Sequence, residues 1–292
     1  MQIARLQLRR QTVDPCQRDV DWAAWLAQSP WHTSTLLKQD GASWVRAVPA
    51  PSGSSSEQVV VKCRIDRGFR AGIKRLFRSS RGDRQWRGAQ WLIRHGLRTA
   101  QPLALLRANI AGQPCELLVL ERLQGKSVLE HLASNELSIR EQHHVARELG
   151  RLIAAFSHHG GYNRDGKPSN LIVIRDSGEV LRVATIDTVA IRTWDQTETV
   201  EEMLASLYIE PKGCGTPPRL ALRARVIREL INQFQTASST KRGWSSRTRW
   251  TPEFFRRSIR WAWHEADFIV QCHGDPTPKI NPINPAVRKP ST

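Results

Sequence analysis

The feature that most constrains this chain is a polar loop that lies between a long helix and a pair of strands. Apolar residues recur at helical spacing over 138–156, which predicts a helix. The loop and a first strand follow at 162–174 as YNRDGKPSNLIVI. An Asp-Ser-Gly turn and a second strand, VLRVATI at 180–186, come next and lead directly to Asp187. The order is therefore loop, strand, turn, strand, carboxylate.

Residue types in this pattern suit the transfer of a phosphoryl group. That reaction needs a carboxylate to receive the proton of the acceptor hydroxyl, oxygen ligands for magnesium, and cations on the phosphates. Asp165 and Asn170, five residues apart, match the Asp and Asn of the HRDLxxxN catalytic loop of kinases, and Lys167 lies between them. Asp187 has the place of the metal-binding Asp of a DFG motif. Lys62 closes a VVVK strand, as does the lysine that contacts the α/β-phosphates in kinases.

The rest of the chain agrees with an α+β fold. A first helix is predicted at 19–28. A second, at 79–95, has Trp86, Ala89 and Ile93 at the spacing of one helix face and ends at Gly96, a natural C-cap. Runs rich in β-forming residues predict the strands 34–38, 44–48, 59–65, 101–108 and 115–123. From 127 onward the pattern is helical, and the long helix begins with Ser138 as N-cap and Glu141 as its capping-box partner. We predict a two-lobed protein-kinase-like fold, with a small antiparallel β-rich N-lobe and a larger, mainly α C-lobe.

The predicted domain boundaries follow from these elements. They are an N-terminal extension at 1–30, an N-lobe at 31–123, a C-lobe at 124–275 and a flexible Pro-rich tail at 276–292. No repeat with a period of 20 to 50 residues is present, which argues against a solenoid or a propeller.

The chain resembles the Kdo and heptose lipopolysaccharide kinases, a branch of the protein-kinase-like superfamily that phosphorylates sugars of the lipopolysaccharide inner core. RQWRGAQWLIRHGLRTAQPLALL at 84–106 is similar to the helix of that family and the short strand that begins at a Pro. FSHHGGYNRDGKPSNLIVI at 156–174 is similar to its catalytic loop, and IDTVAI at 186–191 to its Ile-Asp strand end. The resemblance covers about residues 33 to 210.

This resemblance implies ATP and Mg²⁺ as cofactors and a role for each matched residue. Asp165 is expected to orient the acceptor hydroxyl and accept its proton, and Lys167 to neutralise charge on the transferring group. Asn170 and Asp187 are expected to hold magnesium. The residues expected to contact the nucleotide are Lys62, Gly41 in the phosphate-covering turn, Gln85 beside the lysine, and Glu121 and Leu123 at the ends of the hinge.

The chain departs from the family pattern at several positions. The supporting His of the catalytic loop is Asn163, and the large apolar residue after the catalytic Asp is Gly166. Gln85 stands where the helix carboxylate that pairs with the strand lysine is expected, and Asp83 lies two residues away. A neutral amide can accept a hydrogen bond from Lys62 but cannot neutralise its charge.

Charge predicts the kind of partner. The chain has 44 Lys and Arg against 27 Asp and Glu, a net charge of +17, which suits anionic lipid, phosphorylated glycolipid or nucleic acid. A basic coding bias is the alternative explanation. No long apolar run is present and MQIARLQLRR lacks the apolar core of a secretory signal, so we expect a cytoplasmic protein, peripheral at the inner face of the membrane. The five cysteines show no metal-ligand spacing, which predicts reduced thiols and no structural zinc.

The segment 241–270 mixes arginines with tryptophans and places apolar residues on one face of a predicted helix. It can pack on the C-lobe, contact anionic lipid headgroups or stack nucleic-acid bases. We favour packing, and nucleic acid is the least favoured of the three. His158 and His159 are acid or base candidates by residue type, although a solvated helix end explains them as well.

The preferred interpretation is a kinase for a hydroxyl of a lipid-linked sugar. The alternatives are a protein Ser/Thr kinase and a non-catalytic pseudokinase module on an anionic surface. No Ala-Pro-Glu motif follows Asp187, which disfavours a protein substrate, although IEPKGCGTPP at 209–218 is a degenerate candidate for a peptide platform.

Overall fold

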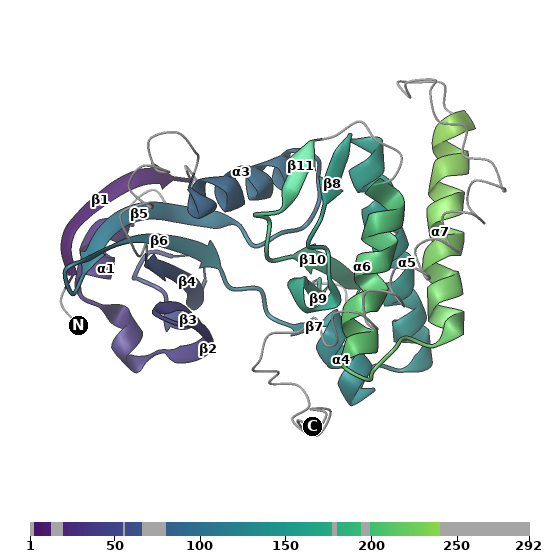
Figure 1. Ribbon diagram of the computed structural model, residues 1–292, viewed down its shortest axis with the longest axis horizontal. Coiled ribbons are helices and arrows are strands. Elements are labelled where there is room, and N and C mark those ends of the chain that lie inside the picture. The colour runs from purple at the N-terminus through teal and green to yellow at the C-terminus, as the bar shows by residue number, and fades with distance from the viewer. Residues whose placement is uncertain are drawn as a thin grey trace. The chain divides into compact units, whose positions relative to one another are not determined.

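The structure is a computed structural model that describes residues 3–12, 20–54, 56–65, 80–176, 180–193 and 199–239 (Figure 1). It is an α+β structure, as predicted, and the chain divides into two units. Unit 1 holds Met1–Arg94 and Thr99–Leu123, and unit 2 holds His95–Arg98 and the chain from Gln124 onward. The predicted segment 241–270 and the tail 276–292 lie outside the described residues.

Within the described part of unit 1, six antiparallel strands form one sheet in the order β1-β5-β6-β4-β3-β2. The strands are β1 (Ile3–Gln11), β2 (Thr35–Asp40), β3 (Ser43–Pro49), β4 (Gln58–Ile65), β5 (Pro102–Ile110) and β6 (Gln113–Glu121). The five strands predicted from the sequence are therefore confirmed. Strand β1 was not predicted, because it falls in the segment assigned to an N-terminal extension.

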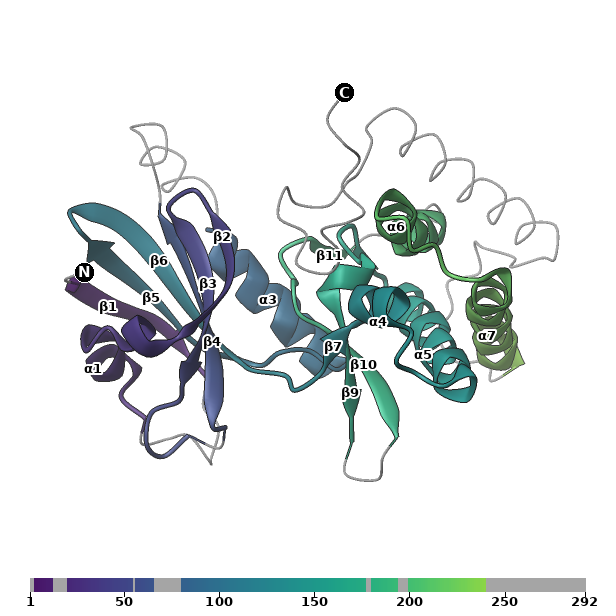
Figure 2. The same cartoon turned by 90° about the horizontal axis from the view of Figure 1, so that it is seen from below.

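Helices cover both faces of this sheet (Figure 2). Alternate residues of β4, among them Val59 and Val61, point into an apolar core with Trp22 and Leu26 of α1 (Trp22–Ala27). Lys62, an intervening residue of β4, faces α3 (Arg81–Arg94) and donates to Gln85, because successive side chains of a strand point to opposite faces. One face of the sheet therefore packs on the apolar core, and the other face contacts α3.

Helix α3 buries Trp86 and Ala89 as predicted, but not Ile93, whose exposed fraction is 42%. Leu92 lies one position earlier on the helix and is fully buried. The apolar stripe of the helix therefore runs through Leu92, and the sequence pattern was wrong for Ile93.

Unit 2 is mainly helical in its described residues. The helices are α4 (Val128–Ser134), α5 (Ile139–His158), α6 (Thr199–Gly213) and α7 (Leu220–Ser239), with the 3-10 turn η3 (Pro168–Asn170). Short strands form a sheet β10-β9-β7 and a pair β11-β8, with β7 (Lys126–Ser127), β8 (Gly161–Asn163), β9 (Leu171–Arg175), β10 (Leu181–Thr185) and β11 (Ile191–Thr193). The predicted capping box of α5 is confirmed, since the Ser138 side chain accepts from the Glu141 amide and Glu141 accepts from that of Ser138.

Helices α5 and α7 pack closely against each other in unit 2. A Cβ at Gly150 of α5 would lie 2.5 Å from the Val226 carbonyl oxygen of α7, so only glycine permits this approach. None of the helices in the described residues combines the length and the apolar character that a membrane span requires.

Candidate functional site

The predicted catalytic loop joins β8 to β9 and includes η3. Asn163 ends β8 and is almost fully buried, with an exposed fraction of 2%. Its Oδ1 accepts a hydrogen bond of 3.2 Å from the Asp165 amide, and its carbonyl oxygen accepts one of 3.3 Å from the Gly166 amide. The side chain of Asn163 therefore supports the backbone of the loop, although the resemblance leads one to expect a histidine there.

The loop lies next to the end of the β9–β10 hairpin. Asn170 donates through Nδ2 to the Asp165 carbonyl oxygen at 3.0 Å, and its own carbonyl oxygen accepts from the Ile186 amide at 3.0 Å. Because Thr185 pairs with Leu171, Asp187 lies at the same end of the hairpin as Asn170. The fold thus gathers Asp165, Asn170 and Asp187, which are separated by up to 22 positions in the sequence.

Asn170 and Asp187 offer an amide and a carboxylate, and magnesium prefers oxygen ligands of these kinds. The Asn170 amide nitrogen is directed at the Asp165 carbonyl, which fixes the plane of its oxygen, and one Asp187 oxygen accepts from the Val189 amide at 3.3 Å. Magnesium is commonly bound through one or two protein ligands together with substrate phosphates. The pair fits that pattern, and no cluster of three or more His, Cys, Asp or Glu able to hold a metal occurs among the described residues.

Lys167 lies between two carboxylates. Its Nζ is 3.9 Å from Asp165 Oδ1 and 3.9 Å from Glu210 Oε1. The Asp165 side chain is 42% exposed, whereas that of Glu210 is 2% exposed. Glu210 comes from α6 and was not singled out from the sequence, where it belongs to the stretch considered as a peptide platform. The structure places Ile209–Gly213 in the last turns of α6.

In unit 1, the predicted lysine, Lys62, lies next to Gln85, the residue at the position of its expected helix partner. Lys62 Nζ donates to Gln85 Oε1 at 3.2 Å, from β4 to α3. Asp83 takes other partners, because its oxygens accept from Arg9 at 2.9 Å and Arg10 at 3.1 Å, both of β1. Burial alone raises the pKa of Asp83, but the Ser80 hydroxyl and the two arginines outweigh it and hold the pKa below its usual value. The amide of Gln85 therefore supplies a helix group that contacts the lysine.

A second buried carboxylate in unit 1 was missed from the sequence. Glu116 on β6 has an exposed fraction of 7%, and its Oε1 accepts from the Gly82 amide at 2.6 Å. A carboxylate at the first turn of a helix interacts favourably with the unpaired amides and the helix dipole there. Glu116 thereby fixes the start of α3 on the sheet, in the same region as the Asp83 ion pairs.

The remaining nucleotide-binding candidates lie in turns or at strand ends of unit 1. Gly41 lies in the two-residue turn between β2 and β3 with φ of +58°, a conformation that favours glycine. Glu121 ends β6, where its amide donates to the Gln101 carbonyl oxygen and its carboxylate accepts from the Gln101 amide. Leu123 is the residue after which the chain leaves unit 1.

The two histidines considered as acid or base candidates belong to an aromatic cluster at the end of α5. The His159 ring lies 4.4 Å from that of His95 and 5.1 Å from that of His158, between centroids. Burial, together with the charges of the other two rings, lowers the pKa of His159. The three histidine rings thus contact one another. The loop that follows β8 contains a carboxylate of its own, that of Asp165.

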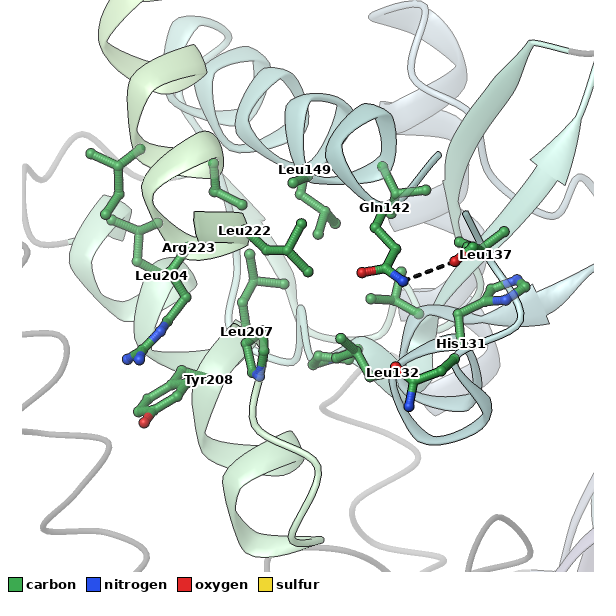
Figure 3. A pocket seen from close by; sticks show the side chains of 18 residues that line it. His131, Leu132, Leu137, Gln142, Leu149, Leu204, Leu207, Tyr208, Leu222 and Arg223 are labelled. Carbon is green, nitrogen blue, oxygen red and sulfur yellow. Dashed lines mark hydrogen bonds between the residues drawn. The ribbon is translucent and has the colours of Figure 1, made fainter. Parts of the chain in front are cut away.

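An apolar cavity of about 100 Å³ lies in unit 2 between α4, α5, α6 and α7 (Figure 3). Leu149, Leu204, Leu207 and Leu222 point into it, and Pro168 of the loop between β8 and β9 forms part of its wall. None of the described residues that line it is a carboxylate, so it offers magnesium no anionic ligand. The cavity is distinct in chemistry from the polar cluster around Asp165.

Comparison of the chain with protein-family models gave no match, and comparison with curated proteins gave none. Function is therefore inferred from the residues and their geometry.

Proposed function

We propose that this protein is an ATP-dependent phosphotransferase with a protein-kinase-like fold. The observation that carries the proposal is the grouping of Asp165, Asn170 and Asp187 where the catalytic loop meets the β9–β10 hairpin. Phosphoryl transfer depends mostly on positioning and on charge stabilisation. This cluster supplies two carboxylates and an amide oxygen, and Lys167 adds an ammonium group beside Asp165.

In the proposed reaction, Asp165 accepts a hydrogen bond from the acceptor hydroxyl and receives its proton. The hydroxyl oxygen forms a bond to the γ-phosphorus of ATP, while the bond from that phosphorus to the β,γ-bridging oxygen breaks and ADP leaves with the electron pair. Lys167 is close enough to Asp165 to place positive charge beside the transferring group, with the two side chains 3.9 Å apart.

The proposed cofactor is magnesium, held by Asn170 and Asp187 together with the phosphates. When bound, the ion neutralises charge that develops on the phosphate oxygens. The chain itself fixes both ligands, because the backbone of Asn170 is hydrogen-bonded to that of Ile186 next to Asp187.

In unit 1, Lys62 is the proposed contact of the α/β-phosphates and Gln85 its positioning partner, which the 3.2 Å hydrogen bond supports. Gly41 is the proposed phosphate-covering residue, since its turn places backbone rather than side chain at the tip. The chain from Glu121 to Leu123 is the proposed adenine contact, where main-chain groups after a strand end meet the base.

The proposed acceptor is a hydroxyl of a lipid-linked sugar. The resemblance to lipopolysaccharide kinases favours it, and a net charge of +17 suits both a phosphorylated glycolipid and an anionic membrane surface. A protein acceptor is the alternative substrate class.

One observation favours a different class of function, a non-catalytic binding module. The helix residue that accepts a hydrogen bond from Lys62 at 3.2 Å is Gln85, whose side chain is a neutral amide and carries no charge, whereas kinases have a carboxylate at that position. Magnesium-dependent phosphate transfer distinguishes this module from an enzyme.

The test is transfer of phosphate from labelled ATP to purified deacylated lipopolysaccharide core and, in parallel, to a generic protein substrate, each with and without magnesium. We expect magnesium-dependent transfer to the sugar. Transfer to protein alone would move the assignment to a protein kinase, and absence of both transfer and ATP binding would favour the binding module.

A further inference from the structure

Glu210 is the most completely buried carboxylate near the catalytic loop among the described residues, with an exposed fraction of 2%. It accepts two short hydrogen bonds from one residue of that loop. The Ser169 amide donates to Oε2 at 2.7 Å, and the Ser169 hydroxyl donates to Oε1 at 2.6 Å. Helix α6 is therefore joined to the loop at the residue directly before Asn170.

Burial of a carboxylate is unfavourable unless donors and a counter-charge compensate it. Ser169 supplies two donors, and the Lys167 ammonium lies 3.9 Å from Oε1. Lys167 is at the same distance from Asp165, so one cation lies between two carboxylates that come from different elements. If the Glu210 charge were removed, Asp165 would be the carboxylate of the described residues that remains within 3.9 Å of the Lys167 ammonium.

We propose that Glu210 is a positioning residue for phosphoryl transfer. Its carboxylate holds Ser169, which orders the backbone before Asn170, and it attracts the Lys167 ammonium, which otherwise closes on Asp165. Asp165 then keeps an oxygen for the acceptor hydroxyl, and Lys167 remains available to the phosphoryl group. This inference rests on the proposed function and assigns a role to a residue that the kinase motifs do not include.

The test uses Glu210→Gln, which removes the charge and retains hydrogen bonds. The Gln carbonyl oxygen accepts from the Ser169 amide, and its NH₂ group donates to the Ser169 hydroxyl oxygen. We expect kcat to fall roughly 10- to 100-fold, with KM for ATP changed less than about threefold, because the interaction acts on the reacting groups. Glu202→Gln, on the same helix and exposed, is the matched control and should leave kcat unchanged.

A double-mutant cycle separates positioning of Lys167 from a purely structural role. If Glu210 acts through Lys167, then Glu210→Gln in a Lys167→Gln background costs roughly twofold or less in kcat. If Glu210 only stabilises the fold, the fold-decreases in kcat of the two single variants multiply in the double variant. If Glu210→Gln does not fold, Glu210→Asp in the same two backgrounds keeps the charge, shortens its reach and gives the same comparison.

The acceptors are those that the wild type phosphorylates, and thermal unfolding of each variant is measured alongside kinetics. A wild type that transfers phosphate while Glu210→Gln keeps full kcat overturns the inference alone, and so do multiplicative losses in the cycle. A folded wild type that binds ATP but transfers phosphate to no acceptor overturns the proposed function and this inference with it.

Discussion

Lys62 and Gln85 form a hydrogen bond of 3.2 Å between strand β4 and helix α3, where the proposed function leads one to expect an ion pair. Gln85 is 4% exposed, so its amide oxygen accepts from the ammonium in a largely dry environment. A hydrogen bond to a charged group in such a place is stronger than one between neutral groups. The relationship therefore makes Gln85 the residue whose replacement tests the role of Lys62.

Gln85→Leu should lower kcat/KM for ATP by roughly 10- to 100-fold, which corresponds to the 1.5–3 kcal/mol of a hydrogen bond to a charged group. Gln85→Glu, which restores an anionic partner, should keep or raise that value. Steady-state kinetics with varied ATP measures both. Gln90→Leu, further along α3 and half-buried, is the matched control. Equal kinetics for the wild type and Gln85→Leu would show that Lys62 does not depend on this contact.

Asp83→Asn should destabilise unit 1 by about 1–3 kcal/mol, because charge-assisted bonds from Arg9 and Arg10 to a buried carboxylate are weakened. These bonds join β1 to the first turn of α3, so ATP affinity should fall with stability. Urea unfolding and calorimetric titration with ATP measure the two effects. Asp40→Asn, at the exposed end of β2, should change neither. Reduced stability with unchanged ATP affinity would separate β1 from the Lys62 site.

Asn163→Ala should lower kcat roughly tenfold, since the Asp165 amide loses its acceptor and the Asp165 carboxylate, the proposed general base, is less well oriented. Phosphate-transfer kinetics measures the effect. Tyr162→Phe is a suitable control, because it lies on the same strand and its hydroxyl donates to Glu202 rather than to the loop. A similar loss in both variants would point to general damage to β8.

The sequence predicted helices and strands well where their own signals are local. Ser138 and Glu141 mark the start of α5 three residues apart, and Gly41 marks the turn between β2 and β3. Strand β1 lacked such a signal. Its pairing with β5 is interrupted by two register shifts, and irregularities of this kind break the alternation of apolar and polar residues by which a strand is recognised.

The site was predictable only in part for a related reason. Asp165, Lys167 and Asn170 lie within six positions and share a motif, so their spacing is informative. Glu210 contacts Ser169 across 41 positions of sequence, and Glu116 contacts Gly82 across 34. Contacts between residues so far apart in the sequence depend on how the helices and strands pack. No local sequence pattern predicts which buried glutamate accepts a hydrogen bond from which backbone amide.

Glu141→Gln tests the capping box of α5, the helix that precedes β8 and the Asp165 loop. Hydrogen bonds from Arg175 and Ser138 lower the pKa of Glu141 from its ordinary 4.5 to about 2. A lowered carboxyl pKa stabilises the fold above pH 4.5, and this stabilisation is lost as pH falls toward 2. The variant should be less stable by about 1 kcal/mol at pH 7, with a smaller difference at pH 3. Urea unfolding followed by circular dichroism measures it, and a difference independent of pH would contradict the assignment.

We propose Asp165 as the catalytic carboxylate of a phosphotransferase. The most direct measurement is kcat for magnesium-dependent phosphate transfer by the wild type and by Asp165→Ala, with ATP affinity determined on the same samples. We predict that kcat falls by roughly 10²–10⁴-fold, the usual contribution of a general base, while ATP affinity stays within about threefold. Equal kcat in the two proteins, with both folded and binding ATP, would contradict the claim.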